Sequence, residues 1–164
     1  MAAIAYVRGM EAVLNGTVQL GGVTVKALLT TAAYAPNAAT HAYRSDVAPE
    51  AAPVSGYLSG GVNATAVVVR DEANNRLTLV LGGAAWTVPA GQTLVGRRLV
   101  HYVSTGNAAT DWLLACYSLD ADFSATNRTA TIGQISIVFD FAPTTAVPGA
   151  TYVAPGYVAP GYVA

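Results

Sequence analysis

His41, Ser45 and Asp46 lie close together in the sequence, and their residue types are those of the catalytic triad of many hydrolases. Such hydrolases commonly place the serine in a Gly-x-Ser-x-Gly turn, and the chain contains no such sequence. Three polar residues within a short stretch of loop are more typical of turns and helix caps. We therefore predict no catalytic residues here, and the chain is not expected to be an enzyme.

Aspartate oxygens are suitable calcium ligands, and Asp120 and Asp122 follow Asp111 closely in the sequence. The surrounding residues lack the glycine and the final glutamate of a calcium loop, so turn-forming aspartates explain the pattern. The two histidines, His41 and His101, are far apart and have no carboxylate at a ligand spacing. We predict no metal site, and we expect His101 to be either exposed or hydrogen-bonded at a sheet face.

Cys116 is the only cysteine, which excludes an intrachain disulfide and a cysteine metal cluster. It lies in the apolar run 112–117, where a buried thiol is expected. The glycine pairs Gly60-Gly61 and Gly82-Gly83 are not followed by Gly-Lys-Ser/Thr, so neither forms a phosphate-binding loop. We predict no cofactor and no small-molecule substrate.

The composition favours a protein with much of its surface covered by neighbours. Only 10% of the residues are charged, the net charge is −1, and Lys26 is the only lysine beside seven arginines. Interfaces favour arginine over lysine, whereas nucleic-acid binding needs a basic stripe that is absent here. We find no apolar stretch long enough to span a membrane and no secretory signal pattern, so synthesis in the cytoplasm is expected.

Residues 152–164 repeat Tyr-Val-Ala-Pro-Gly without any charge. Regular prolines exclude a helix and interrupt a sheet, while tyrosine and valine offer apolar anchors to a groove. A flexible linker without a partner is the alternative. The predicted anchors on a partner protein are Tyr152, Val153, Pro155, Tyr157, Val158, Pro160 and Tyr162.

Short β-branched runs separated by turn residues dominate the remaining sequence. Residues 3–14 have the spacing of a short amphipathic helix that ends at Asn15-Gly16. Predicted strands cover residues 18–20, 23–30, 64–70, 76–81, 94–104, 112–119 and 132–141, with turns at 21–22, 71–75, 89–91, 105–107 and 120–122. This pattern predicts a mainly β fold, an antiparallel β-sandwich or barrel with a short N-terminal helix, a long irregular loop and an extended C-terminal tail.

Two of these strands, in residues 66–69 and 77–81, are almost continuously apolar, which is typical of strands covered on both faces. The last strand instead alternates apolar and polar residues, as in a sheet with one face on a core. Residues 31–61 contain three prolines and no periodicity, and we interpret them as an extended arm or covering loop. The predicted partner-binding residues of this arm are Tyr34, His41, Tyr43 and Arg44.

Several segments resemble small structural proteins of tailed-bacteriophage virions. The similarity is carried by residues 6–17, by residues 25–37 and by Ala39-Thr-His-Ala-Tyr-Arg-Ser-Asp46, and more loosely by residues 99–107 and 133–140. It extends over roughly residues 5–141. The resemblance implies a virion component, and among such components we favour a capsid decoration protein.

The expected function is that of a cement protein, which binds the outer surface of the major capsid lattice and its own copies, as a homotrimer, and stabilises the head. The alternatives are another virion component, such as a tail tube or head fibre, or a carbohydrate-binding β-sandwich that exposes Trp86 and Trp112. We predict a β domain at residues 1–146 and a repeat tail at residues 147–164.

Overall fold

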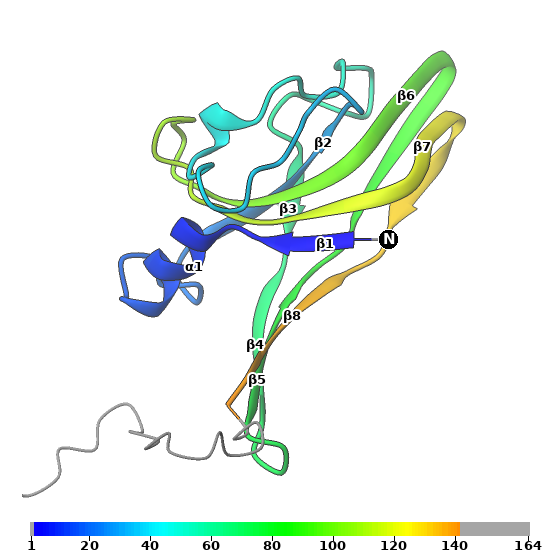
Figure 1. Cartoon of the computed structure of the whole chain (residues 1–164). Coiled ribbons are helices and arrows are strands. Elements are labelled where there is room, and N and C mark those ends of the chain that lie inside the picture. The colour runs from blue at the N-terminus through cyan, green and yellow to red at the C-terminus, as the bar shows by residue number, and fades with distance from the viewer. Residues whose placement is uncertain (1, 142–164) are drawn as a thin grey trace, which may run out of the picture.

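The computed structural model of the chain describes residues 2–141, and these form a mainly β fold with one short α-helix (Figure 1). The mainly β prediction is confirmed. The elements are β1 (Ala2–Ala5), α1 (Val7–Leu14), β2 (Thr24–Thr30), a 3-10 turn (Arg44–Asp46), β3 (Val62–Ala64), β4 (Ala66–Asp71), β5 (Arg76–Leu81), β6 (Ala84–Ser104), β7 (Leu113–Ile132) and β8 (Ile135–Asp140).

The strands form two antiparallel sheets. The larger sheet has the order β1-β7-β6-β2-β3, and the smaller one has the order β4-β5-β8. The smaller sheet extends away from the larger one, as Figure 1 shows, and we call it the projecting sheet. The two sheets do not close on each other, so the barrel alternative is wrong.

Strands β6 and β7 are much longer than the strands predicted at residues 94–104 and 112–119. The expected turn at residues 89–91 lies inside β6, where the pairing shifts between Val88 and Thr93, and the expected turn at residues 120–122 is extended strand in β7. A second shift in the pairing adjoins Gly96, where a Cβ atom would crowd the side chain of Leu29 at 3.1 Å. These irregularities let the hairpin curve over the sheet, because bulges bend strands and increase their twist.

The curved hairpin encloses the main hydrophobic core. Trp86 and Leu94 from β6 and Ile132 from β7 pack with Leu29 and Leu99 of the sheet centre, and all five side chains are buried. A second cluster joins the two sheets through the base of the projecting sheet, where the buried residues include Leu79, Leu81 and Ile135. The core therefore extends from the curved hairpin to the root of the projecting sheet.

Helix α1 begins at Val7 rather than at residue 3. Residues Ala2–Ala5 pair with β7 as strand β1, because the edge of β7 offers them backbone hydrogen bonds. Gly9 allows the helix to lie directly on β7, since a Cβ atom there would overlap the carbonyl of Leu113. The helix ends at Asn15 and Gly16 as predicted, whereas residues 18–20 form a loop and no strand.

Residues 31–61 form the expected irregular segment, with only the 3-10 turn and isolated bridges. The segment covers its own sheet rather than extending away from it (Figure 1). Tyr34 and Val47 pack on one face, and the phenol of Tyr57 bonds the backbone N–H and carbonyl of Leu29 at 3.0 and 3.2 Å. It therefore acts as a covering loop of the domain.

Within residues 2–141, no helix is both long enough and apolar enough to cross a membrane.

Candidate interaction surface

One face of the projecting sheet carries exposed valines, with Thr78 and Ser136 between them. Val67 pairs with Val80, and Val69 and Val138 both pair with Thr78, so these side chains point to the same side of the sheet. Val67, Val69 and Val138 are 53%, 47% and 54% exposed. We call the surface of Val67, Val69, Val80 and Val138 the valine face.

Scattered apolar side chains are ordinary on protein surfaces, but neighbouring ones on adjacent strands mark interaction sites. The valine face meets this criterion because its members come from all three strands. At its far end Arg76 and Asp140 form an ion pair of 2.8 Å in the same register. A partner would therefore meet an apolar centre bordered by charge at one end.

The same sheet presents an open edge. In the part of the chain that the structure describes, β4 pairs only with β5, so its outer backbone groups have no strand partner. Such an edge can accept an additional strand from another chain. The expectation that residues 66–69 are covered on both faces is wrong for the single chain, because Val67, Val68 and Val69 are about half exposed.

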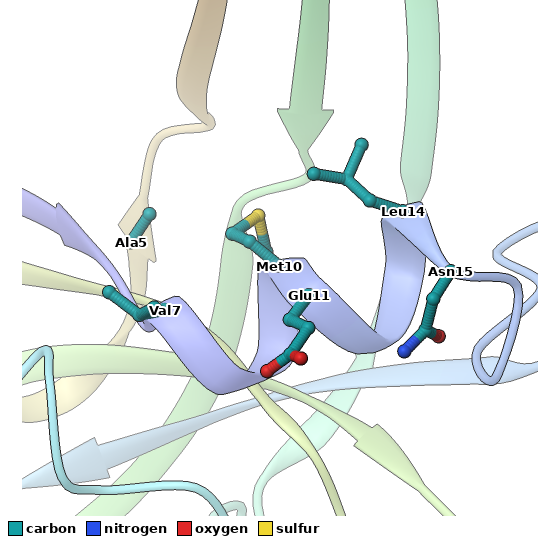
Figure 2. Close-up of a pocket in the computed structure, with 6 residues that line it drawn as sticks. All are labelled: Ala5, Val7, Met10, Glu11, Leu14 and Asn15. Atoms are coloured by element: carbon teal, nitrogen blue, oxygen red, sulfur yellow. The ribbon is translucent and has the colours of Figure 1, made fainter.

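A second apolar surface lies beside α1, and we call it the α1 groove. It has one depression of about 550 Å³, lined by residues of α1 together with Ala5 and Asn15, and another of about 120 Å³ between the helix and the projecting sheet. Met10 and Leu14 line both, and Figure 2 shows them extending from the same side of α1. The sheet contributes Val68, Leu77 and Phe139 to the narrower depression.

The predicted arm residues bind within their own domain. The hydroxyl of Tyr34 lies 2.8 Å from that of Tyr6 and 3.0 Å from Nδ1 of His41, and burial raises the pKa of Tyr34 to about 12. Tyr43 packs against the ring of Trp112 at 4.6 Å. Tyr34 is 1% exposed and offers no surface to a partner, which corrects its expected role. For His41, Tyr43 and Arg44, partner binding stays a prediction.

Arg44 holds the covering loop through a buried carboxylate. Its Nε donates to Asp111 Oδ2 at 2.7 Å, and the backbone N–H of Thr105 donates to Asp111 Oδ1 at 2.6 Å. Burial acts against ionisation, but these donors outweigh it and lower the pKa of Asp111. The guanidinium also lies 5.4 Å from the ring centre of Tyr102. This arrangement ties the covering loop to the segment that precedes β7.

The side chains near Ser45 have structural partners. Asp46 accepts hydrogen bonds from the backbone N–H groups of Ala42 and Tyr43 at 2.8 and 3.0 Å. Burial opposes ionisation here too, yet these bonds lower the pKa of Asp46. The hydrogen bonds of His41 are to Tyr34 and the backbone of Asn37. Asp46 thus serves as the cap that the sequence indicates.

The aspartates considered for calcium have other contacts. Asp111 pairs with Arg44, and Asp122 lies 3.5 Å from Arg97 in the neighbouring strand. Across residues 2–141, no group of three histidine, cysteine, aspartate or glutamate side chains is placed to hold a metal. Cys116 is buried, as predicted.

The carbohydrate-binding alternative requires exposed tryptophans, and the structure does not provide them. Trp86 is 1% exposed and packs edge-on against Tyr57, with ring centres 5.7 Å apart. Trp112 is partly buried beneath Tyr43. A stacking platform for a sugar ring is therefore absent at these two residues.

The seven predicted tail anchors, Tyr152, Val153, Pro155, Tyr157, Val158, Pro160 and Tyr162, lie outside the described residues, as does the expected boundary at residues 146 and 147. The valine face was not predicted from the sequence. The run Ala66-Val-Val-Val69 contributes to it, but that run has the composition of a buried strand and occurs here at an exposed edge.

Comparison with known proteins returned no match: no family model fits the chain, and no significant relative was found among the curated proteins or the solved structures. The resemblance to virion structural proteins therefore stays a prediction.

Proposed function

We propose that this protein is a structural component of a bacteriophage virion that decorates and cements the capsid. The observation that carries the proposal is the valine face, an apolar surface on a sheet that extends away from the core. The resemblance noted in the sequence supplies the kind of assembly. The proposed partners are the major capsid protein and further copies of this chain, arranged as a homotrimer on the capsid surface.

Hydrophobic burial would supply the driving force for attachment. Fully burying a valine side chain stabilises a complex by about 1.5 to 3 kcal/mol, so covering a half-exposed valine is worth about 1 kcal/mol. A few such residues give only a modest free energy of attachment for one contact. On a lattice the attachment is stronger, because copies that contact several subunits at once dissociate far more slowly than any single contact would allow.

The open edge of β4 adds a specific element to the proposed contact. A strand from a neighbouring subunit could pair with β4, while its alternate side chains pack beside Val67 and Val69 and extend the valine face. Main-chain hydrogen bonds would fix the register, and the ion pair of Arg76 with Asp140 would limit how far the contact extends. Such pairing would also cover the apolar run that the sequence predicts to be buried.

The test is attachment to intact particles that carry this protein. We expect the double substitution Val67→Asp and Val69→Asp to abolish co-sedimentation with particles while the circular dichroism spectrum is retained. The matched control is Val95→Asp in β6, because Val95 is 45% exposed and lies in the other sheet. Absence of the chain from particles, or full attachment of the double variant, would refute the proposal.

A further inference from the structure

The α1 groove adjoins the point where the described chain ends. Phe141 lines the narrower depression beside Leu14 and Phe139, and its side chain is 52% exposed. Its backbone N–H donates to the carbonyl of Asn75 at 2.9 Å, which holds the end of β8 in place. Whatever follows residue 141 therefore starts at the mouth of an apolar groove.

We propose that, in the free protein, the α1 groove binds the C-terminal repeat segment of the same chain, residues 152–164. This segment is thereby the ligand of a site on its own domain. The inference goes beyond the decoration function, which depends on the opposite face of the projecting sheet.

The length of the connecting chain permits this contact. Residues 142–151 separate Phe141 from Tyr152, and eleven residue steps span at most about 40 Å when extended. A flexible chain of that length has a mean end-to-end distance of about 17 to 20 Å. Helix α1 has eight residues and is about 12 Å long, so the first tyrosine reaches any part of it. A tether of this kind supplies an effective concentration in the millimolar range.

The chemistry of the segment matches that of the groove. Residues 142–164 contain no charged side chain, and tyrosine and valine recur every five residues. The narrower depression is lined by apolar residues alone, among them Met10, Leu14 and Leu77. The wider depression also has Glu11 and Asn15 at its border, which can accept a hydrogen bond from a tyrosine hydroxyl.

The segment offers several anchors, and the groove has two depressions. In an extended Pro-rich conformation of about 3.1 Å per residue, successive tyrosines of the segment would be about 15 Å apart. The two depressions share Met10 and Leu14 in their linings, which run from Ala5 on one side to Phe141 on the other. We infer that neighbouring anchors of one segment occupy the two depressions. A docked segment is unavailable to a partner, so the free and assembled proteins would differ in its position.

The test compares NMR spectra of full-length chains. We expect the triple substitution Tyr152→Ser, Tyr157→Ser and Tyr162→Ser to shift the methyl resonances of Leu14, Leu20 and Leu77 and to leave those of the main core unchanged. In the reverse experiment, Leu14→Ser moves the tail tyrosine amide resonances to random-coil positions. Leu58→Ser is the matched control, because Leu58 is 74% exposed and Leu14 is 71% exposed.

A synthetic peptide with the sequence of residues 152–164 provides the second readout. It should shift groove resonances of the triple-serine variant more than those of the natural chain, in which the groove is occupied. The proposal fails if the triple substitution shifts no groove resonance or if Leu14→Ser leaves the tyrosine amides unchanged. Shifts that depend on protein concentration and accompany dimer formation would also overturn it, because they would show docking on a second copy. These outcomes are independent of particle attachment.

Discussion

The imidazole of His101 donates a hydrogen bond of 2.8 Å from Nε2 to the carbonyl oxygen of Gly82. His101 lies in the centre of the larger sheet, and Gly82 connects β5 of the projecting sheet to β6. The ring is fully buried, and its Nδ1 has no hydrogen-bond partner within residues 2–141. One neutral side chain thus joins the two sheets where the chain crosses between them.

This bond predicts a dependence of stability on pH. Burial lowers the pKa of His101, and the bond to Gly82 opposes that effect only in part. In the unfolded chain the imidazole binds a proton below its ordinary pKa of about 6.5, whereas in the native protein it stays neutral until the pH reaches its lower native pKa. The contribution of His101 is therefore complete above about pH 6.5 and is lost as the pH falls through the lower native pKa.

We expect the free energy of unfolding of the natural chain to decrease by up to about 1.4 kcal/mol per pH unit below pH 6.5 through this residue. Urea unfolding at several pH values measures it. In a His101→Gln variant the slope between pH 6.5 and 5 should be smaller, because glutamine does not titrate. Equal slopes in the two proteins would contradict the assignment.

The ion pair of Arg44 with Asp111 predicts a large effect of a small substitution. Asp111→Asn removes the charge that accepts from Arg44 and Thr105 at a site that is 1% exposed. We expect a loss of about 2 to 3 kcal/mol in the free energy of unfolding. The control Glu72→Gln breaks the exposed pair with Arg70 and should cost about 0.5 kcal/mol or less. Equal losses of stability in the two variants would show that burial does not strengthen the ion pair of Arg44 with Asp111.

The contact between α1 and β7 depends on the absence of a side chain at Gly9. A Cβ atom there would overlap the carbonyl of Leu113, so we expect Gly9→Ala to destabilise the domain by about 1 to 3 kcal/mol despite the better helix propensity of alanine. Gly21→Ala is the matched control, because no atom lies within 4 Å of its added Cβ. Thermal unfolding distinguishes the two, and a stabilised Gly9→Ala variant would refute the close packing.

The thiol of Cys116 should be unreactive in the folded protein. Burial is the main cause that raises its pKa to about 11, so very little thiolate forms at neutral pH. We expect a thiol reagent to modify the native chain only as fast as it unfolds, and to modify it rapidly in denaturant. Fast modification of the native protein, measured by mass spectrometry, would show that the site opens locally.

The valine face predicts poor solubility of the isolated chain. Replacing Val67, Val69 and Val138 by threonine keeps β-branched side chains in the strands and adds polar groups at half-exposed positions. We expect a higher solubility limit and less aggregation at an unchanged melting temperature, measured by light scattering and calorimetry. A soluble natural chain with no change in the variant would argue against an uncovered interaction surface.

Local patterns in the sequence were sufficient for most of the secondary structure. Each of β2, β4, β5 and β8 consists mainly of apolar and β-branched residues that are neighbours in the sequence. The turn at residues 71–75 and the helix end at Asn15-Gly16 follow from residue types alone. Burial of Cys116 follows likewise from its apolar neighbours. These features depend on interactions between residues that are near one another in the chain.

Only the tertiary structure decided which surfaces are covered. Residues 89–91 and 120–122 have the composition of turns, yet they lie inside β6 and β7, at two places where the pairing of these strands shifts. The long pairing on either side of each shift keeps the chain running along the sheet. Residues 66–69 have the composition of a buried strand, yet β4 lies at the edge of a sheet with one bare face. The reason is physical: a run of β-branched side chains favours an extended chain through local sterics, whereas burial depends on what other parts of the chain pack against it.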